Sequence, residues 1–261
     1  MEEPCSPGEA ISRWVEARAR GAAGAVTSWG SGISGRETLR LFWERDGEEV
    51  PPGEDLEEEN WTPFWRESLR TTAVTERISL VPAWEDVPTG IACPLRIDPG
   101  MAFGAGDHPT TRLCLRVLED VASGEGLPAR VLDVGSGTGV LALAAACLGA
   151  AEVDALDIDP FGYAACRRNA ALNGLEERVR PLLLSLDLLD GAYPLVLANV
   201  VVGQIEVLAP YLRQRLAAGG TLILSGFESE AASRAAQVLG LTVRRTLEEE
   251  GWAALVLRSP E

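Results

Sequence analysis

The sequence predicts an α/β domain built on a doubly wound, mostly parallel sheet, preceded by a smaller α+β domain. From residue 131 to residue 257, short apolar strand-like runs alternate with helical segments, as in a parallel sheet covered by helices on both faces. A turn with glycines at alternate positions, Gly135, Gly137 and Gly139, follows the first of these strands. The second strand ends on an acid, Asp157. Together these features are typical of a Rossmann-like nucleotide-binding unit.

The strands and helices follow one another in a regular order. A buried strand over residues 131–133 leads through the glycine turn into an Ala- and Leu-rich helix that begins at about Val140. A second strand from residue 153 precedes a helix over residues 160–173, ended by a left-handed cap. We expect further strands at 179–184, 195–198 and 221–226, helices at 204–216 and 229–239, and a terminal hairpin of 241–245 with 252–257. Such a hairpin can insert one antiparallel strand into the sheet.

Four polar residues fall where these strands end. They are Asp133, Asp157, Asp187 and Asn199. Ligands of open α/β sheets bind beyond the carboxyl ends of the strands, so we expect the four side chains to share one site. Each alone is typical of a helix cap or a turn, whereas the set indicates a ligand. Asp187 is expected to approach an adenine amino group.

The glycine turn distinguishes between two classes of cofactor. A dinucleotide fingerprint, G-x-G-x-x-G counted from Gly135, needs its third glycine at position 140, which is Val140. Asp133 precedes the turn, and a carboxylate there disfavours a pyrophosphate and favours a cationic, phosphate-free ligand. Asp157 lies where a carboxylate accepts hydrogen bonds from both ribose hydroxyls. The pattern therefore favours S-adenosylmethionine (AdoMet) over a nicotinamide cofactor, and both over a turn that binds nothing.

Composition limits the classes of function. With 39 acids against 23 bases the net charge is −16, which disfavours direct binding of nucleic acid and favours a basic protein partner, although such acidity also serves solubility. We find no apolar run of about eighteen residues and no basic, apolar leader, so we expect no membrane association and a cytoplasmic location. The five cysteines form no C-x-x-C pair, which indicates a reducing compartment without structural zinc; Cys114 and Cys147 are interpreted as small buried hydrophobes.

The chain is expected to contain two domains. Residues 1–88 would form a substrate-recognition domain and a linker, and residues 89–261 the AdoMet-binding domain. Residues 44–59 are rich in acids and cannot bury enough apolar surface to fold alone, so we expect an exposed loop there. The stretch 82–88 begins and ends with proline and is interpreted as the linker. We expect a monomer.

Residues 97–111 read I-D-P-G-M-A-F-G-A-G-D-H-P-T-T, a turn-rich segment before an amphipathic helix. Asp107 or Thr110 is expected to cap that helix. His108 is the only histidine in the chain, and no second histidine or nearby cysteine offers metal-ligand spacing. We therefore expect no metal, and we favour a structural or positioning role for His108 over acid–base catalysis.

Together with the glycine turn and with D-I-D-P at residues 157–160, the block D-P-G-x-A-F-G-x-G-x-H-x-T-T resembles the bacterial ribosomal protein L11 methyltransferases. The block is far more specific than the glycine turn, and the resemblance covers about residues 90–261. It implies a Rossmann-like, AdoMet-dependent class I methyltransferase that modifies amino groups of ribosomal protein L11, namely lysine side chains and the N-terminal amine.

The resemblance also implies roles for individual residues. Thr111, Gly135, Asp157 and Asn199 match positions that contact AdoMet, and Phe103 and Gly104 match positions that line the methyl-transfer chamber. With the residues argued above, the candidate cofactor-binding set is Phe103, Gly104, Thr111, Asp133, Gly135, Gly137, Gly139, Asp157, Asp187 and Asn199.

Asn199 is the candidate catalytic residue, because its side-chain carbonyl can orient the acceptor amine or the methionine end of the cofactor. It is followed by three valines rather than by the Pro-Pro-aromatic sequence of methyltransferases that act on planar nitrogens, which disfavours a nucleobase acceptor. Three alternatives remain open: a methyltransferase of another protein or a small amine, a non-catalytic module that binds AdoMet or a protein, and an NAD-dependent oxidoreductase.

Overall fold

The computed structural model describes residues 2–4, 38–40, 69–99, 102, 104, 106–124 and 126–261. The chain divides into two compact units, residues 1–68 and 69–261, and each is considered by itself. In the first unit, β1 (Glu2–Pro4) pairs antiparallel with β2 (Thr38–Arg40). The acidic stretch 44–59 and Phe103 lie outside the described residues. The assignment of residues 1–88 and 89–261 to two domains stays a prediction.

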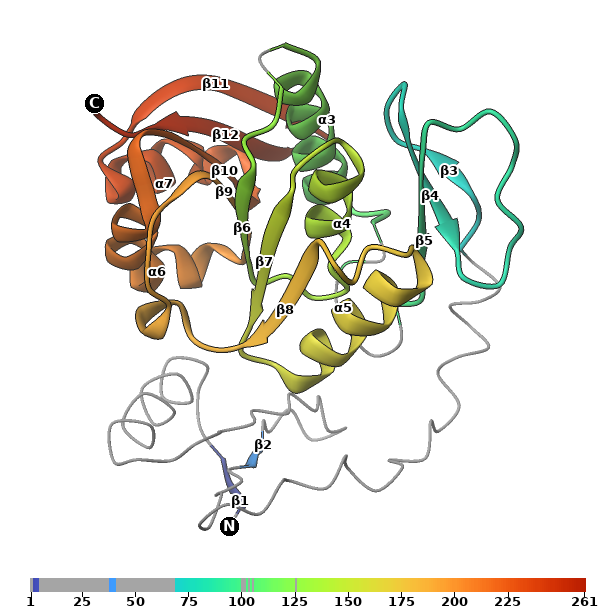
Figure 1. Ribbon diagram of the computed structural model, residues 1–261. Helices are drawn as coiled ribbons and strands as arrows, with labels where there is room; N and C mark the ends of the chain where they lie inside the picture. Colours follow the sequence, from blue (N-terminus) through green and yellow to red (C-terminus); the bar gives the residue numbers. More distant parts are fainter. Residues whose placement is uncertain are drawn as a thin grey trace. The chain divides into compact units, whose positions relative to one another are not determined.

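A seven-stranded sheet forms the centre of the second unit, in the order β11-β12-β10-β9-β6-β7-β8 (Figure 1). Five strands run parallel: β6 (Arg130–Val134), β7 (Glu152–Asp157), β8 (Val179–Leu183), β9 (Tyr193–Asn199) and β10 (Leu216–Glu228). β12 (Trp252–Arg258) lies antiparallel between β10 and β11 (Thr242–Glu249). The predicted doubly wound, mostly parallel sheet with one inserted antiparallel strand is therefore confirmed.

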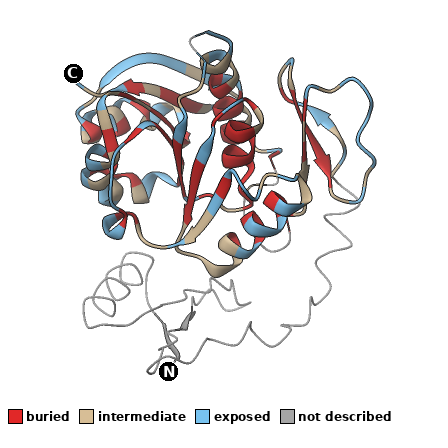
Figure 2. Cartoon of the chain, viewed as in Figure 1, coloured by how far each residue is buried: buried red, intermediate tan, exposed pale blue. Residues whose placement is uncertain are grey.

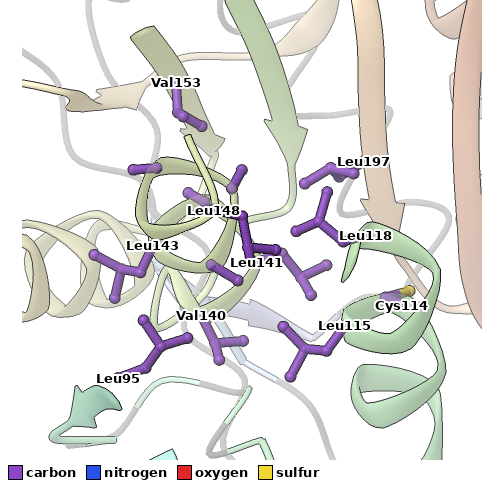
Figure 3. Packing of buried hydrophobic residues seen from close by; sticks show 14 of the residues in the cluster. Leu95, Cys114, Leu115, Leu118, Val140, Leu141, Leu143, Leu148, Val153 and Leu197 are labelled. Carbon is purple, nitrogen blue, oxygen red and sulfur yellow. The ribbon is translucent and has the colours of Figure 1, made fainter. Parts of the chain in front are cut away.

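Helices cover both faces of this sheet. Against one face pack α3 (Pro109–Gly124), α4 (Val140–Cys147) and α5 (Pro160–Leu172). Against the other pack α6 (Val202–Arg215) and α7 (Ala232–Leu239), while η1 (Leu186–Leu188) and η2 (Ser229–Ala231) are single turns. Successive strand residues point to opposite faces, so Leu197 of β9 packs with α3 and α4 (Figure 3), whereas Val196 and Ala198 pack with α6.

The first helix after the glycine turn is buried on all sides. Residues 140–146 of α4 are all buried, which fits a helix that is apolar all round (Figure 2). The next helix, α5, begins as its sequence predicts: Pro160 is its first residue and the Asp159 carboxylate accepts a hydrogen bond from Phe161 N at 2.9 Å. Gly174, with φ +64°, follows its last turn.

A second, three-stranded sheet precedes the first helix of the unit. It contains β3 (Thr72–Ala73), β4 (Ile78–Pro82) and β5 (Cys93–Ile97), with β3 antiparallel and β5 parallel to β4. Residues 82–88, interpreted as a linker, begin at the last residue of β4 and lie in the connection between β4 and β5. α5 holds the outer edge of β5, because the Asn173 side chain accepts from Arg96 N at 2.8 Å and donates to Arg96 O at 2.7 Å.

The interpretation of Cys147 as a small buried hydrophobe is wrong. Cys147 ends α4, is partly buried, and forms a disulfide with Cys93 at the start of β5, with their Cα atoms 6.0 Å apart. The two residues are 54 positions apart, so their spacing gave no sign of the pairing. Cys114 is buried and free as expected, and burial raises the pKa of its thiol to about 12. Among the described residues, no helix is long and apolar enough to span a membrane.

Candidate active site

The glycine turn lies where the chain order of the sheet reverses, since β6 pairs with β7 on one side and with β9 on the other. Gly135, Gly137 and Gly139 have φ values of +72°, +51° and +82°, which side chains with a Cβ rarely adopt. The amides of Gly135 and Ser136 donate to Leu156 O at 2.8 and 3.0 Å. This fixes the turn against the end of β7, with its backbone open to a close ligand.

Asp157 stands beside this turn, as the sequence predicts. Its Oδ2 accepts a hydrogen bond from Gly137 N at 2.7 Å and its Oδ1 accepts one from Asp159 N at 2.9 Å. A Cβ at Gly162 of α5 would lie 2.6 Å from Oδ2, so only glycine leaves room for this carboxylate. Burial raises the pKa of Asp157, opposed by these amide donors.

Asp133 lies deeper, one strand away. It is 1% exposed, and its Oδ2 accepts from Ala142 N, in the first turn of α4, at 3.1 Å. Burial raises the pKa of its carboxyl group to about 7, and the negative charge of Asp157 adds to the effect. Among the described residues no salt bridge reaches either carboxylate. Two carboxylates without a salt-bridge partner, beside a turn of glycines, fit a ligand that brings hydroxyl groups and positive charge.

Thr111 and Asn199 come together from distant parts of the sequence. Asn199 Nδ2 donates to Thr111 Oγ1 at 3.3 Å across 88 positions of sequence. Thr111, in the first turn of α3, is 1% exposed. With the amide nitrogen engaged, the Asn199 carbonyl oxygen accepts no hydrogen bond within the described part of the chain. That oxygen is therefore available to a donor such as an amine.

Gly104 contacts the glycine turn directly. Thr138, between Gly137 and Gly139, donates its hydroxyl to Gly104 O, and a Cβ at Gly104 would lie 3.1 Å from Thr138 Oγ1. Asn169 of α5 adds a second link, because its Nδ2 donates to Thr138 O at 2.9 Å and to Asp98 O at 3.1 Å. Its Oδ1 accepts from Asp98 N at 2.9 Å. One buried amide thus joins the start of the 98–108 segment to the turn.

His108 caps α3. Its Nδ1 lies 2.8 Å from Thr110 Oγ1 and 3.3 Å from Thr110 N, and its ring packs edge-on against Trp252 with centroids 4.6 Å apart. The expectation that Asp107 or Thr110 caps this helix is therefore wrong. The imidazole supplies the acceptor for the amide two residues ahead, which is the geometry of an N-cap side chain.

Most of the sequence candidates described by the structure form one connected group. Gly104, Thr111, Gly135, Gly137, Gly139, Asp157 and Asn199 are linked by the contacts above or through one intervening residue. Asp187 is exposed on η1, after β8, and within the described part of the chain no hydrogen bond or salt bridge joins it to the other candidates. Its proximity to an adenine stays a prediction.

Sequence reasoning missed several residues that build this group. From the sequence, Thr138 is expected only in a turn, Asn169 and Gly162 only in a helix, and Gly226 only at a strand end. In the structure Val200 lies against Gly135, and Gly226 lies against Val200. A fully buried asparagine inside an otherwise ordinary helix, and a glycine at the end of a central strand, were the available signals.

Comparison with known proteins gives one family. The family model of ribosomal protein L11 methyltransferase (PrmA) matches residues 38–260. The ribosomal protein L11 methyltransferase of Symbiobacterium thermophilum is 42% identical over 210 residues, which cover 78% of this chain and 67% of that protein.

Solved structures agree with this family at the level of the fold. The crystal structure of a ribosomal protein L11 methylase from Lactobacillus delbrueckii subsp. bulgaricus matches with a TM-score of 0.66 and 31% identity, over 74% of this chain and 100% of that one. A 16S rRNA methyltransferase of T. thermophilus, solved with AdoMet and guanosine, matches with a TM-score of 0.52 and 24% identity, over 62% of this chain and 46% of that one. The second likeness concerns the fold alone.

Proposed function

We propose that this chain, which belongs to the ribosomal protein L11 methyltransferase family and is thus an AdoMet-dependent methyltransferase, methylates amino groups of ribosomal protein L11. The acceptors are lysine side chains and the N-terminal amine. The observation that carries the proposal is the Asn199 carbonyl, which has no partner among the described residues and lies two residues before the exposed Val201. It offers an amine a hydrogen-bond acceptor next to the glycine turn.

The same proposal assigns the cofactor contacts. Asp157 accepts hydrogen bonds from the ribose hydroxyls, Asp133 favours positive charge, and Gly135, Gly137 and Gly139 let the backbone approach the ligand. Thr111 and Asn199 contact the methionine end, Asp187 the adenine, and Phe103 and Gly104 line the chamber. When bound, AdoMet supplies an electrophilic methyl group on a sulfonium.

The acceptor amine must lose a proton before it can react, because an ammonium has no lone pair. A chamber that excludes water lowers the pKa of a lysine by disfavouring its charged form. Asn199 then orients the neutral amine by accepting one N–H, and holding donor and acceptor in line supplies much of the rate. No dedicated base is required in this proposal.

The proposal also concerns the protein partner, the oligomeric state and the cellular location. A net charge of −16 suits a basic protein partner and opposes nucleic acid. We propose that residues 1–88 grip the substrate, that the protein acts as a monomer, and that it works in the cytoplasm.

The direct test is mass spectrometry of L11 after incubation with this protein and isotopically labelled AdoMet. Label on lysine side chains and on the N-terminus is expected. All 23 basic residues of the enzyme are arginine, so it contains no lysine of its own and lysine label can come only from the substrate.

A variant of L11 with every lysine replaced by arginine is the matched control. It should retain label on the N-terminal amine alone. Absence of label from unmodified L11, while AdoMet still binds the enzyme by calorimetry, would contradict the proposed acceptor. Such a result would leave a methyltransferase of another protein or a small amine.

A further inference from the structure

The residue that follows Asn199, the last residue of β9, packs against an irregularity of β10. Ser225 of β10 pairs with Asn199 of β9, and Ser225 O accepts a hydrogen bond from Val200 N at 3.1 Å. Immediately after Ser225, the pairing of β10 with β12 shifts by one residue at Gly226. Gly226 has φ +102°, which strongly favours glycine. The bulge therefore turns a bare backbone toward Val200.

This contact joins backbone to backbone. A Cβ at Gly226 would lie 2.1 Å from Val200 O, 2.5 Å from Val200 C and 2.8 Å from Val200 N. These atoms belong to the main chain, so no change of rotamer can relieve the overlap. Any side chain at position 226 must displace the peptide that follows Asn199.

The other side of Val200 contacts the cofactor turn. A Cβ at Gly135 would lie 3.0 Å from Val200 Cγ1, and Val200 itself is 7% exposed. Val200 is therefore enclosed between two glycines, one in the turn that follows β6 and one in the bulge of β10. The next residue, Val201, is 62% exposed, so the chain leaves the enclosure at once.

We propose that Val200 and Gly226 are positioning residues that set the Asn199 carbonyl at a fixed distance from the glycine turn. Asn199 is held at one end by Thr111 and at the other by the enclosed Val200 peptide. The inference rests on the proposed role of Asn199 toward an amine. Gly226 acts through Val200 and touches neither cofactor nor substrate.

An equilibrium measurement tests this without L11. The probes are S-adenosylhomocysteine and an AdoMet analogue in which an amine-bearing carbon replaces the methylated sulfur. Both ligands share the adenine, the ribose and the terminal amino-acid group, so the ratio of their dissociation constants reports on the added amine. One hydrogen bond to a charged amine should favour the analogue about tenfold or more in the unmodified enzyme.

Gly226→Ala and Gly191→Ala form a matched pair. Gly191 has φ +91° but nothing lies within 4 Å of an added Cβ, so both changes strain the backbone and only the first displaces Val200. Gly226→Ala and Asn199→Ala should both bring the ligand ratio close to one, whereas Gly191→Ala should preserve it. Turnover of L11 should fall about tenfold in Gly226→Ala, close to the loss in Asn199→Ala, because the first variant displaces the carbonyl group that the second removes.

A second pair covers the case in which Gly226→Ala fails to fold. Val200→Ala removes the Cγ1 methyl group that lies nearest to Gly135, and Val196→Ala makes the same change within β9, in the same apolar cluster. Val200→Ala should lower the ligand ratio and Val196→Ala should not. A purely structural role would lower stability in both and leave both ratios unchanged.

The outcomes separate the two claims. If the unmodified enzyme does not prefer the amine analogue, or if Gly226→Ala and Val200→Ala keep the ratios of their controls, the inference is overturned. If the ratios behave as expected but L11 gains no label, the inference stands and the proposed acceptor is wrong.

Discussion

The two halves of the candidate site are built in different ways. The cofactor half, residues 130–157, is one continuous stretch in which β6, the glycine turn, α4 and β7 follow one another. The acceptor half is assembled from separate segments that carry Gly104, Thr111, Asn199 with Val200, and Gly226. A local pattern suffices to recognise the first half, whereas the second exists only once the sheet has formed.

The two halves also differ in charge. The cofactor half contains the carboxylates of Asp133, which is buried, and Asp157, which is half-buried, and removal from water raises the pKa of both. The acceptor half, as far as the structure describes it, is held by neutral amides, hydroxyls and backbone contacts. Changes in the first half should therefore be visible in pH dependence and cofactor affinity, and changes in the second in turnover.

Asp133→Asn should give the largest change in the free energy of unfolding, and this change should appear only as the pH rises. The folded protein raises the pKa of Asp133 from 3.8 to about 7, so between these values the native state holds a proton that the unfolded state releases. The free energy of unfolding therefore falls as pH rises from about 4 to about 7. Asn lacks this titration, so above pH 7 the variant should be more stable, by up to about 4 kcal/mol.

Urea unfolding of both proteins from pH 4 to pH 8 measures this difference. The two stabilities should nearly coincide at pH 4 and separate as pH rises. AdoMet affinity should change in the opposite direction and weaken, because a favourable negative charge is lost. Stability curves that stay parallel across the range would mean that Asp133 is ionised throughout in the native state.

Asn169→Leu should follow in size, because this residue joins the two halves. The change removes the hydrogen bonds of the Asn169 amide to Asp98 N, Asp98 O and Thr138 O, and their loss should lower the free energy of unfolding by about 3 kcal/mol. Asn173→Leu is the matched control, since Asn173 pairs with Arg96 but does not reach the glycine turn. Only Asn169→Leu should also weaken AdoMet binding; equal effects on affinity would contradict the link.

The same contrast explains how much could be predicted from the sequence. Periodicity and the three glycines predicted the sheet, its antiparallel insertion and the place of Asp157, because each depends on neighbours within a few residues. The N-cap of α3 was predicted wrongly, since His108 is an uncommon capping residue and Asp107 a common one.

Contacts between distant segments could not be predicted in this way. The disulfide of Cys93 with Cys147 and the enclosure of Val200 by Gly135 and Gly226 join positions whose spacing carries no periodic signal. The resemblance to a known family supplied Thr111 and Asn199 as a pair of candidates, and the structure adds the hydrogen bond between them.

Asp157→Ala tests the cofactor half at a smaller scale. Loss of charge-assisted contacts to the ribose should weaken AdoMet binding by roughly 1.5 to 3 kcal/mol by calorimetry. Asp159→Ala provides the control, because it removes the cap of α5 and about 1 kcal/mol of stability while it leaves the Asp157 carboxylate in place. An unchanged affinity in Asp157→Ala would remove this residue from the cofactor site.

Asn199→Ala is the smallest change in free energy and separates the halves most directly. Without the carbonyl that orients the amine, turnover of L11 should fall about tenfold or somewhat more, equivalent to roughly 1.4 kcal/mol or above. AdoMet affinity should fall by less, because the ribose and turn contacts remain. Steady-state kinetics on L11 and calorimetry with AdoMet measure the two quantities on one preparation. Equal losses of turnover and of AdoMet affinity would assign Asn199 to the cofactor half. A residue that contacts only the methionine end of the cofactor should lower the two quantities together.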